Sequence, residues 1–190
     1  MNSNAVGKLT PTPGQTVGPF YGYALPFAKD RELVAPGSPG SIRLQGTVYD
    51  GAGHPIPDAI LEIWQADADG KVPHRTGSLV RDGYTFTGFG RAATDARGEY
   101  SFTTVLPGPT RPKAASFVAI TVFARGLTNR LYTRAYLPIE EPVLQGDAVL
   151  QSLPEDRRQT LVATPDEDGY RFDVRLQGEG ETVFLRFEEA

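Results

Sequence analysis

Apolar and polar residues alternate along the segment that begins near residue 41. Ile42, Leu44 and Val48 are apolar, polar residues separate them, and an Asp50-Gly51 pair follows. Because successive side chains of a strand point to opposite faces, this pattern predicts a strand with one buried face. Residues 117–124 are nearly all apolar, as is typical of a central strand. Similar β-rich segments bounded by turn residues predict strands over 60–65, 100–106, 131–137, 170–176 and 182–187.

The succession of these segments predicts an all-β chain, a β-sandwich of about eight strands. Glycine and proline number 21 and 16, a content that is typical of many strands joined by tight turns. One short helix is predicted between Pro142 and Leu153, where apolar residues recur at roughly helical spacing.

Proline and glycine punctuate residues 1–41 at a density that neither a helix nor a central strand tolerates. The same stretch contains more large apolar side chains than a disordered tail does; they are Phe20, Tyr21, Tyr23, Leu25 and Phe27. We therefore predict that residues 1–41 form an irregular but ordered arm that packs on its own domain or on a partner. Residues 42–190 are predicted to form the sandwich domain.

The composition argues against several classes of protein. Net charge is −4, and no cluster of lysine and arginine indicates a nucleic-acid surface. Cysteine is absent, which excludes disulfides, thiol nucleophiles and cysteine-ligated metals. No apolar run approaches the ~18 residues of a membrane-spanning helix, and the first residues lack the apolar core of a signal peptide. We expect a cytoplasmic protein.

The chain carries few side chains suited to catalysis on its own. Two histidines are present, His54 in a glycine-rich turn and His74 in a loop, and they form no closely spaced pair. Because a transition-metal site needs several converging donors, both are more simply explained as turn residues in solvent. Asp67 and Asp69 lack the following glutamate of a calcium-binding loop, so they are interpreted as turn residues too.

A series of short motifs runs through most of the chain. They read GQTVGPF at residues 14–20, GTVYD at 46–50, LEIWQA at 61–66, GR at 90–91, TD at 94–95 and GEY at 98–100. Together they resemble the intradiol dioxygenases over roughly residues 14–187. FARG at 123–126, TR at 133–134 and GEGETVF at 178–184 are similar to the iron-free α chain of family members that have two kinds of subunit. The resemblance implies a β-sandwich and a part in opening the ring of 3,4-dihydroxybenzoate with O2.

In this family two tyrosines and two histidines hold a ferric ion. The resemblance places the tyrosine positions at Val72 and Thr110, and the histidine positions at Phe117 and Ala119. Valine, phenylalanine and alanine have no side-chain donor, and one neutral hydroxyl cannot replace two phenolates and two imidazoles. The resemblance therefore implies that this chain holds no metal and that a partner, the β subunit, binds the Fe(III). It also implies a higher hetero-oligomer with the substrate at the interface of the two chains.

Part of the arm is expected to line that shared pocket. The resemblance assigns this role to Thr16, Gly18 and Pro19. A glycine allows the backbone to approach a ligand closely. The same residues also fit an ordinary tight turn, because Gly-Pro serves turns readily.

Arg134 is the candidate for binding the substrate carboxylate. A guanidinium can form two parallel hydrogen bonds with a carboxylate, which orients the ring that carries it. The plainer alternative is a strand arginine that faces water, since charged side chains are mostly exposed. Arg125 and Arg130 are nearby competitors for the same role.

Two other functions fit the residues without the resemblance. One is a transthyretin-like β-sandwich that acts as a binding module and needs no enzyme partner. The other is an independent metalloenzyme with altered ligands. Purifying the chain alone and measuring its iron content separates the second from a metal-free subunit.

Overall fold

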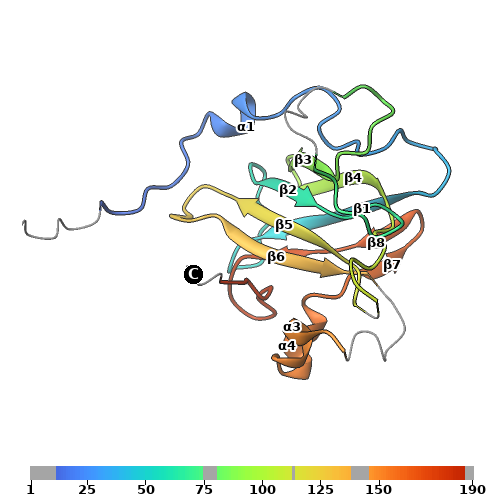
Figure 1. Ribbon diagram of the computed structural model, residues 1–190. Helices are drawn as coiled ribbons and strands as arrows, with labels where there is room; N and C mark the ends of the chain where they lie inside the picture. The colour runs from blue at the N-terminus through green and yellow to red at the C-terminus, as the bar shows by residue number, and fades with distance from the viewer. Residues whose placement is uncertain (1–11, 75–80, 113, 138–145, 187–190) are drawn as a thin grey trace, which may run out of the picture.

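The computed structural model describes residues 12–74, 81–112, 114–137 and 146–186. Its strands are β1 (Ser41–Tyr49), β2 (Ile60–Trp64), β3 (Phe89–Ala93), β4 (Glu99–Val105), β5 (Phe117–Phe123), β6 (Leu131–Tyr136), β7 (Thr164–Asp166), β8 (Gly169–Arg171) and β9 (Val174–Arg175). One sheet has the order β4-β1-β8-β7, with β9 also paired to β1, and the other has the order β3-β2-β5-β6. The two sheets face each other as a sandwich, so the predicted fold class is confirmed (Figure 1).

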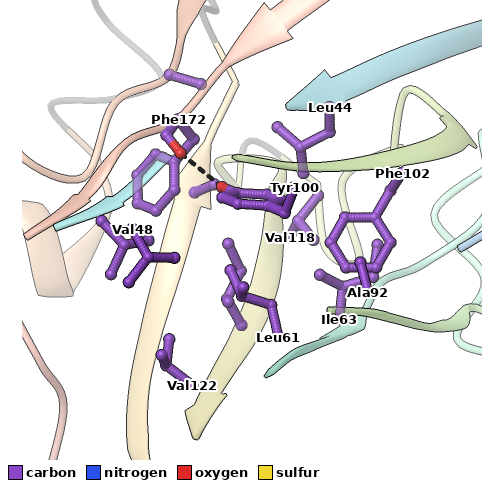
Figure 2. Packing of buried hydrophobic residues seen from close by; sticks show 14 of the residues in the cluster. Leu44, Val48, Leu61, Ile63, Ala92, Tyr100, Phe102, Val118, Val122 and Phe172 are labelled. Carbon is purple, nitrogen blue, oxygen red and sulfur yellow. Dashed lines mark hydrogen bonds between the residues drawn. The ribbon is translucent and has the colours of Figure 1, made fainter. Parts of the chain in front are cut away.

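The core lies between the two sheets. Leu61 and Ile63 of β2 and Val118 of β5 point toward Tyr100 and Phe102 of the opposite sheet (Figure 2). Their alternation with outward residues is the pattern that the sequence shows along each strand. The Tyr100 hydroxyl is buried and donates a hydrogen bond to the Phe172 carbonyl oxygen, which satisfies a polar group inside an otherwise apolar core.

In the described part of the chain, three short helices flank the sandwich: α1 (Tyr21–Ala24), α3 (Ala148–Gln151) and α4 (Glu155–Gln159). Asp147 caps α3, because its carboxylate accepts hydrogen bonds from the backbone N–H groups of Val149 and Leu150. This helix lies inside the predicted range 142–153, of which residues 142–145 fall outside the described part of the chain. The helices α1 and α4 were not predicted. None of the helices in the described ranges is both long and apolar enough to cross a membrane.

The strand predictions differ from the structure at four places, one of which is β7 (Thr164–Asp166), where no strand was predicted. The sequence pattern missed β3 altogether. The predicted strand 170–176 is divided into β8 and β9 by Phe172 and Asp173. The predicted strand 182–187 is wrong over its described residues 182–186, which contribute a single bridge between Leu185 and Tyr132.

The described part of the arm contacts the edges of both sheets. The backbone carbonyl of Asp30 accepts a hydrogen bond from Arg91 N on β3 at 2.8 Å. The N–H of Leu33 donates to the Thr103 carbonyl on β4, also at 2.8 Å. The arm therefore packs on its own sandwich near residues 30–33, while Phe20 and Tyr23 remain largely exposed.

Candidate functional site

A cavity of about 180 Å³ lies at one end of the β3-β2-β5-β6 sheet. Strands β2 and β5 form its floor, since Trp64 pairs with Ala119 and the outward-facing Phe117 lies two residues earlier on β5. The residues that line it are Trp64, Gln65, Ala66, Val72, Pro73, Gly108, Thr110, Ala115, Ser116 and Phe117. Trp64 is 49% exposed, so the cavity opens to the outer face of the sheet.

Two loops close the cavity by packing backbone against backbone. Gly108 N donates to the Asp67 carbonyl at 2.8 Å, and the Asp67 carboxylate accepts from Lys71 N at 2.8 Å. A Cβ atom on Gly108 would lie 2.4 Å from the Ala68 carbonyl oxygen, and one on Gly70 would lie 2.1 Å from the Pro109 oxygen. Both positions therefore require glycine, and Gly70 also has a φ of 81°.

This loop contact brings together three of the four positions that the resemblance predicts to correspond to the family's iron ligands. Val72 and Thr110 enter from the two loops, Phe117 enters from β5, and all three line the cavity. Ala119 does not line it but lies next along the same face of β5. The four positions are thus separated in sequence and gathered at one end of a sheet.

The residues at these positions do not fit a ferric ion. Three side chains have no donor atom, and the fourth offers one neutral hydroxyl. Within the described ranges, no three His, Cys, Asp or Glu side chains are grouped closely enough to hold a metal. His54 lies in an exposed turn, 3.5 Å from the Asp50 carboxylate, and His74 is exposed as well. The Asp67 carboxylate is occupied by turn hydrogen bonds to Asp69 N and Lys71 N.

Arg134 lies beside this cavity, on the outer face of β6. It pairs with Ala119 across the strands, and its guanidinium carbon is 4.1 Å from the centre of the Phe117 ring. Nη1 donates to the Tyr136 hydroxyl at 3.1 Å, which in turn donates to Asp147 at 2.9 Å. Burial raises the pKa of Tyr136 to about 12, so this hydroxyl keeps its proton and both hydrogen bonds at neutral pH.

The arm residues lie at the other end of β5. Thr16 Oγ1 accepts a hydrogen bond from Gly126 N at 2.7 Å, just past the end of that strand. Pro19 lines a separate hollow with Arg125, whose guanidinium forms an ion pair with Asp58. The Gly18 carbonyl accepts a local hydrogen bond from Tyr21 N at 3.3 Å, and a Cβ atom at Gly18 would lie in open space. Within one chain, therefore, the arm residues and Arg134 do not form a common site.

The two competing arginines are engaged elsewhere. Arg125 pairs with Asp58, and Arg130 contacts the Tyr132 hydroxyl and ring. Both lie near the arm, whereas Arg134 lies near the cavity. Of the three, Arg134 is the one that neighbours the lost ligand positions.

Sequence reasoning did not single out Trp64 as a site residue. Trp64 lies within the LEIWQA motif, but no role was predicted for it. The sequence signal that could have identified it is a large aromatic residue at the end of an apolar strand. In the structure, the Trp64 side chain is 49% exposed and its ring centre lies 4.7 Å from that of Phe89. Tryptophan is enriched at interfaces, because its side chain combines a large apolar surface with one polar N–H group.

Comparison with known proteins identifies the class. The family model described as Dioxygenase matches residues 16–178. The chain belongs to this dioxygenase family, and the resemblance inferred from the motifs is confirmed. The dioxygenase domain of a dioxygenase–carbohydrate-binding protein fusion from Streptomyces sp. SirexAA-E has a TM-score of 0.53 and 24% identity, over 89% of this chain and 99% of that one, which supports the fold.

The sequence relatives are more specific. The chain is 42% identical to the protocatechuate 3,4-dioxygenase alpha chain of Pseudomonas putida, over 94% of this chain and 98% of that protein. It is 38% identical to the alpha chain of Burkholderia cepacia, over 93% and 98%. The beta chain of B. cepacia is 32% identical over 76% of this chain and 68% of that protein. Relatives of this chain therefore include both kinds of subunit.

Proposed function

We propose that this chain is the non-catalytic alpha subunit of a protocatechuate 3,4-dioxygenase. The holoenzyme cleaves 3,4-dihydroxybenzoate with O2, between the two hydroxyl-bearing carbons, to 3-carboxy-cis,cis-muconate. A partner beta subunit holds the Fe(III), and the two chains assemble into a higher hetero-oligomer. We further propose a cytoplasmic location.

One observation carries this proposal. Val72, Thr110 and Phe117 line a single cavity at the end of the sheet in a dioxygenase fold, yet none can ligate iron as the family requires. We expect a cavity without metal-binding donors in a chain that has lost its own catalytic activity but whose fold the assembled enzyme still requires. The identity to alpha chains over nearly the full length supports the same conclusion.

The proposed role of this chain is to wall the substrate pocket of its partner and to orient the substrate. Thr16, Gly18 and Pro19 supply backbone and small side chains to that wall, and Arg134 binds the carboxylate. A pocket built from two chains excludes water and fixes the substrate with groups from both. The half-exposed Trp64 and the exposed Phe20 and Tyr23, at the start of the arm helix, provide apolar surface for such an interface.

Co-expression with the candidate beta chain tests the proposal. We expect a stable complex, iron bound in proportion to the beta chain, and turnover of protocatechuate. The alpha chain purified alone is expected to bind no stoichiometric iron and to show no tyrosinate-to-iron colour. A chain that stays monomeric beside the beta chain would favour a transthyretin-like binding module instead. Iron and catechol cleavage in the chain alone would favour an independent metalloenzyme.

A further inference from the structure

Arg134 is held by two aromatic residues of β5 and β6. Its guanidinium carbon lies 4.1 Å from the centre of the Phe117 ring, and its Nη1 donates to the Tyr136 hydroxyl at 3.1 Å. The rings of Phe117 and Tyr136 also pack together, at 5.6 Å between their centres. A ring face and a hydrogen bond together restrict a side chain that is among the most flexible in proteins.

Tyr136 is a rigid support for this contact. Its side chain is fully buried, and its backbone N–H donates to the Leu161 carbonyl at 2.8 Å. Its own carbonyl accepts a hydrogen bond from Ala163 N at 2.9 Å. The hydroxyl is fixed as well, because it donates to Asp147 Oδ1 at 2.9 Å.

Asp147 determines the direction of these hydrogen bonds. The same Oδ1 atom accepts from the backbone N–H groups of Val149 and Leu150, at 2.9 and 3.2 Å, where α3 begins. Because a carboxylate only accepts, the Tyr136 hydroxyl gives its single proton to Asp147 and turns a lone pair toward Arg134. The donors and acceptors are therefore ordered from Arg134 through Tyr136 to the cap of α3.

Tyr136 also stands between the charge of Arg134 and the charge of Asp147. Elsewhere in the described chain, Arg91 shows the usual alternative, a direct ion pair with Glu62 at 2.5 Å. Within the described ranges Arg134 forms no ion pair with a carboxylate, so its guanidinium is oriented without being neutralised there. Such a cation is suited to an anionic group that arrives from outside the chain.

We propose that Tyr136 and Asp147 are positioning residues, which hold the Arg134 guanidinium in the place and orientation that binds the substrate carboxylate in the assembled enzyme. This inference rests on the proposed function, because it requires protocatechuate to reach Arg134. Tyr136 acts through Arg134, and Asp147 acts through Tyr136. Substituting either residue therefore weakens recognition of the carboxylate and leaves recognition of the dihydroxy ring unchanged.

Anaerobic calorimetric titration of the alpha–beta complex tests the inference, since no turnover occurs without O2. The two probes are protocatechuate and catechol, which lacks the carboxylate. Tyr136→Phe keeps the ring and removes the hydroxyl, and it is expected to weaken protocatechuate binding about tenfold while catechol binding stays at the wild-type value. An unchanged affinity for protocatechuate would overturn the proposal. An equal loss for both ligands would also overturn it, because a merely structural role affects both alike.

Tyr100→Phe is the matched control. It also removes a buried tyrosine hydroxyl that donates to a carbonyl, here that of Phe172 in the core between the sheets (Figure 2). It should reduce stability but leave the ratio of the two affinities unchanged. If Tyr136→Phe does not assemble, Asp147→Asn decides. Asparagine still caps α3 but removes the charge that the Tyr136 hydroxyl faces, so protocatechuate binding should weaken about threefold, and an unchanged affinity would refute the arrangement.

Arg134→Ala distinguishes an error in this inference from an error in the proposed function. If the wild-type complex binds no protocatechuate, or if Arg134→Ala binds it as tightly as the wild type, the proposed function or the role of Arg134 is wrong, and the inference is wrong with it. If Arg134→Ala loses affinity and Tyr136→Phe does not, only the positioning is wrong. In the Arg134→Ala background, Tyr136→Phe should have no further effect, because its action passes through Arg134.

Discussion

The guanidinium of Arg134 lies over the ring of Phe117, 4.1 Å from its centre, across the pairing of β5 and β6. Phe117 is one of the positions that the resemblance assigns to a histidine ligand, and Arg134 is the residue proposed to bind the substrate carboxylate. Nη1 of this guanidinium donates to the Tyr136 hydroxyl, which leaves further N–H groups for other acceptors. Phe117 and Arg134, which the sequence analysis assigned to different roles, are therefore direct neighbours in the structure.

Replacing Arg134 should impair substrate binding in the assembled enzyme. In the alpha–beta complex, Arg134→Ala is expected to raise KM for protocatechuate about 10–100-fold, because a charge-assisted hydrogen bond is lost. Steady-state kinetics separates this change from one in kcat. Arg130→Ala, at an exposed arginine in the loop that precedes β6, is the control and should leave KM near wild type. Unchanged kinetics in Arg134→Ala would remove this residue from the substrate site.

Adding a single methyl group where the two cavity loops meet should destabilise the folded chain. Gly108→Ala would place a Cβ 2.4 Å from the Ala68 carbonyl oxygen and 2.5 Å from Gly70 N, which are backbone atoms that cannot move alone. We expect a loss of about 1–3 kcal/mol in the free energy of unfolding, measured by urea denaturation. Gly22→Ala, where nothing lies within 4 Å of the added atom, should be nearly neutral. Equal stability of the two variants would contradict the observed loop contact.

Arg91 should be important for holding the arm on the sandwich. Its Nε lies 2.9 Å from Glu62 Oε1, and its Nη1 donates to the Leu25 carbonyl at 2.6 Å. Both charged side chains are mostly buried, so Arg91→Ala should cost roughly 2 kcal/mol and speed proteolysis within the arm. The exposed Arg97, which pairs with Asp95 and Glu99, is the control, and Arg97→Ala should cost less than about 1 kcal/mol. Arm cleavage at the wild-type rate in Arg91→Ala would count against this anchoring.

Alkaline pH should destabilise the chain through its buried tyrosines. Burial raises the pKa of Tyr21 and of Tyr136 from 10.0 to about 12, so the folded state holds these protons more tightly than the unfolded state does. Their contribution to stability is therefore complete below pH 10 and is lost as the pH rises from 10 toward 12. Urea unfolding at several pH values measures this decline, which Tyr21→Phe and Tyr136→Phe should each flatten. Tyr84→Phe, at a tyrosine that is 97% exposed, is the matched control for the substitution itself.

The sequence indicated the fold class because strand patterns are local. The alternation in β1 and the apolar run of β5 are visible residue by residue. β3 was missed because its Gly90-Arg91-Ala92 centre has weak strand propensity, and pairing with β2 is what makes it a strand. Residues 182–186 show the converse, since they are β-rich in composition yet pair only through Leu185.

The motifs predicted which positions correspond to the family's metal ligands, and the sequence shows which side chains, most of them without donor atoms, stand there. Only the tertiary structure decided that Val72, Thr110 and Phe117 converge, since that depends on Gly70 and Gly108 bringing two distant loops into backbone contact. It also decided that Arg134 lies beside these positions while Thr16 lies at the far end of β5. Strand register and loop packing set such distances, and both arise from contacts between residues far apart in the chain.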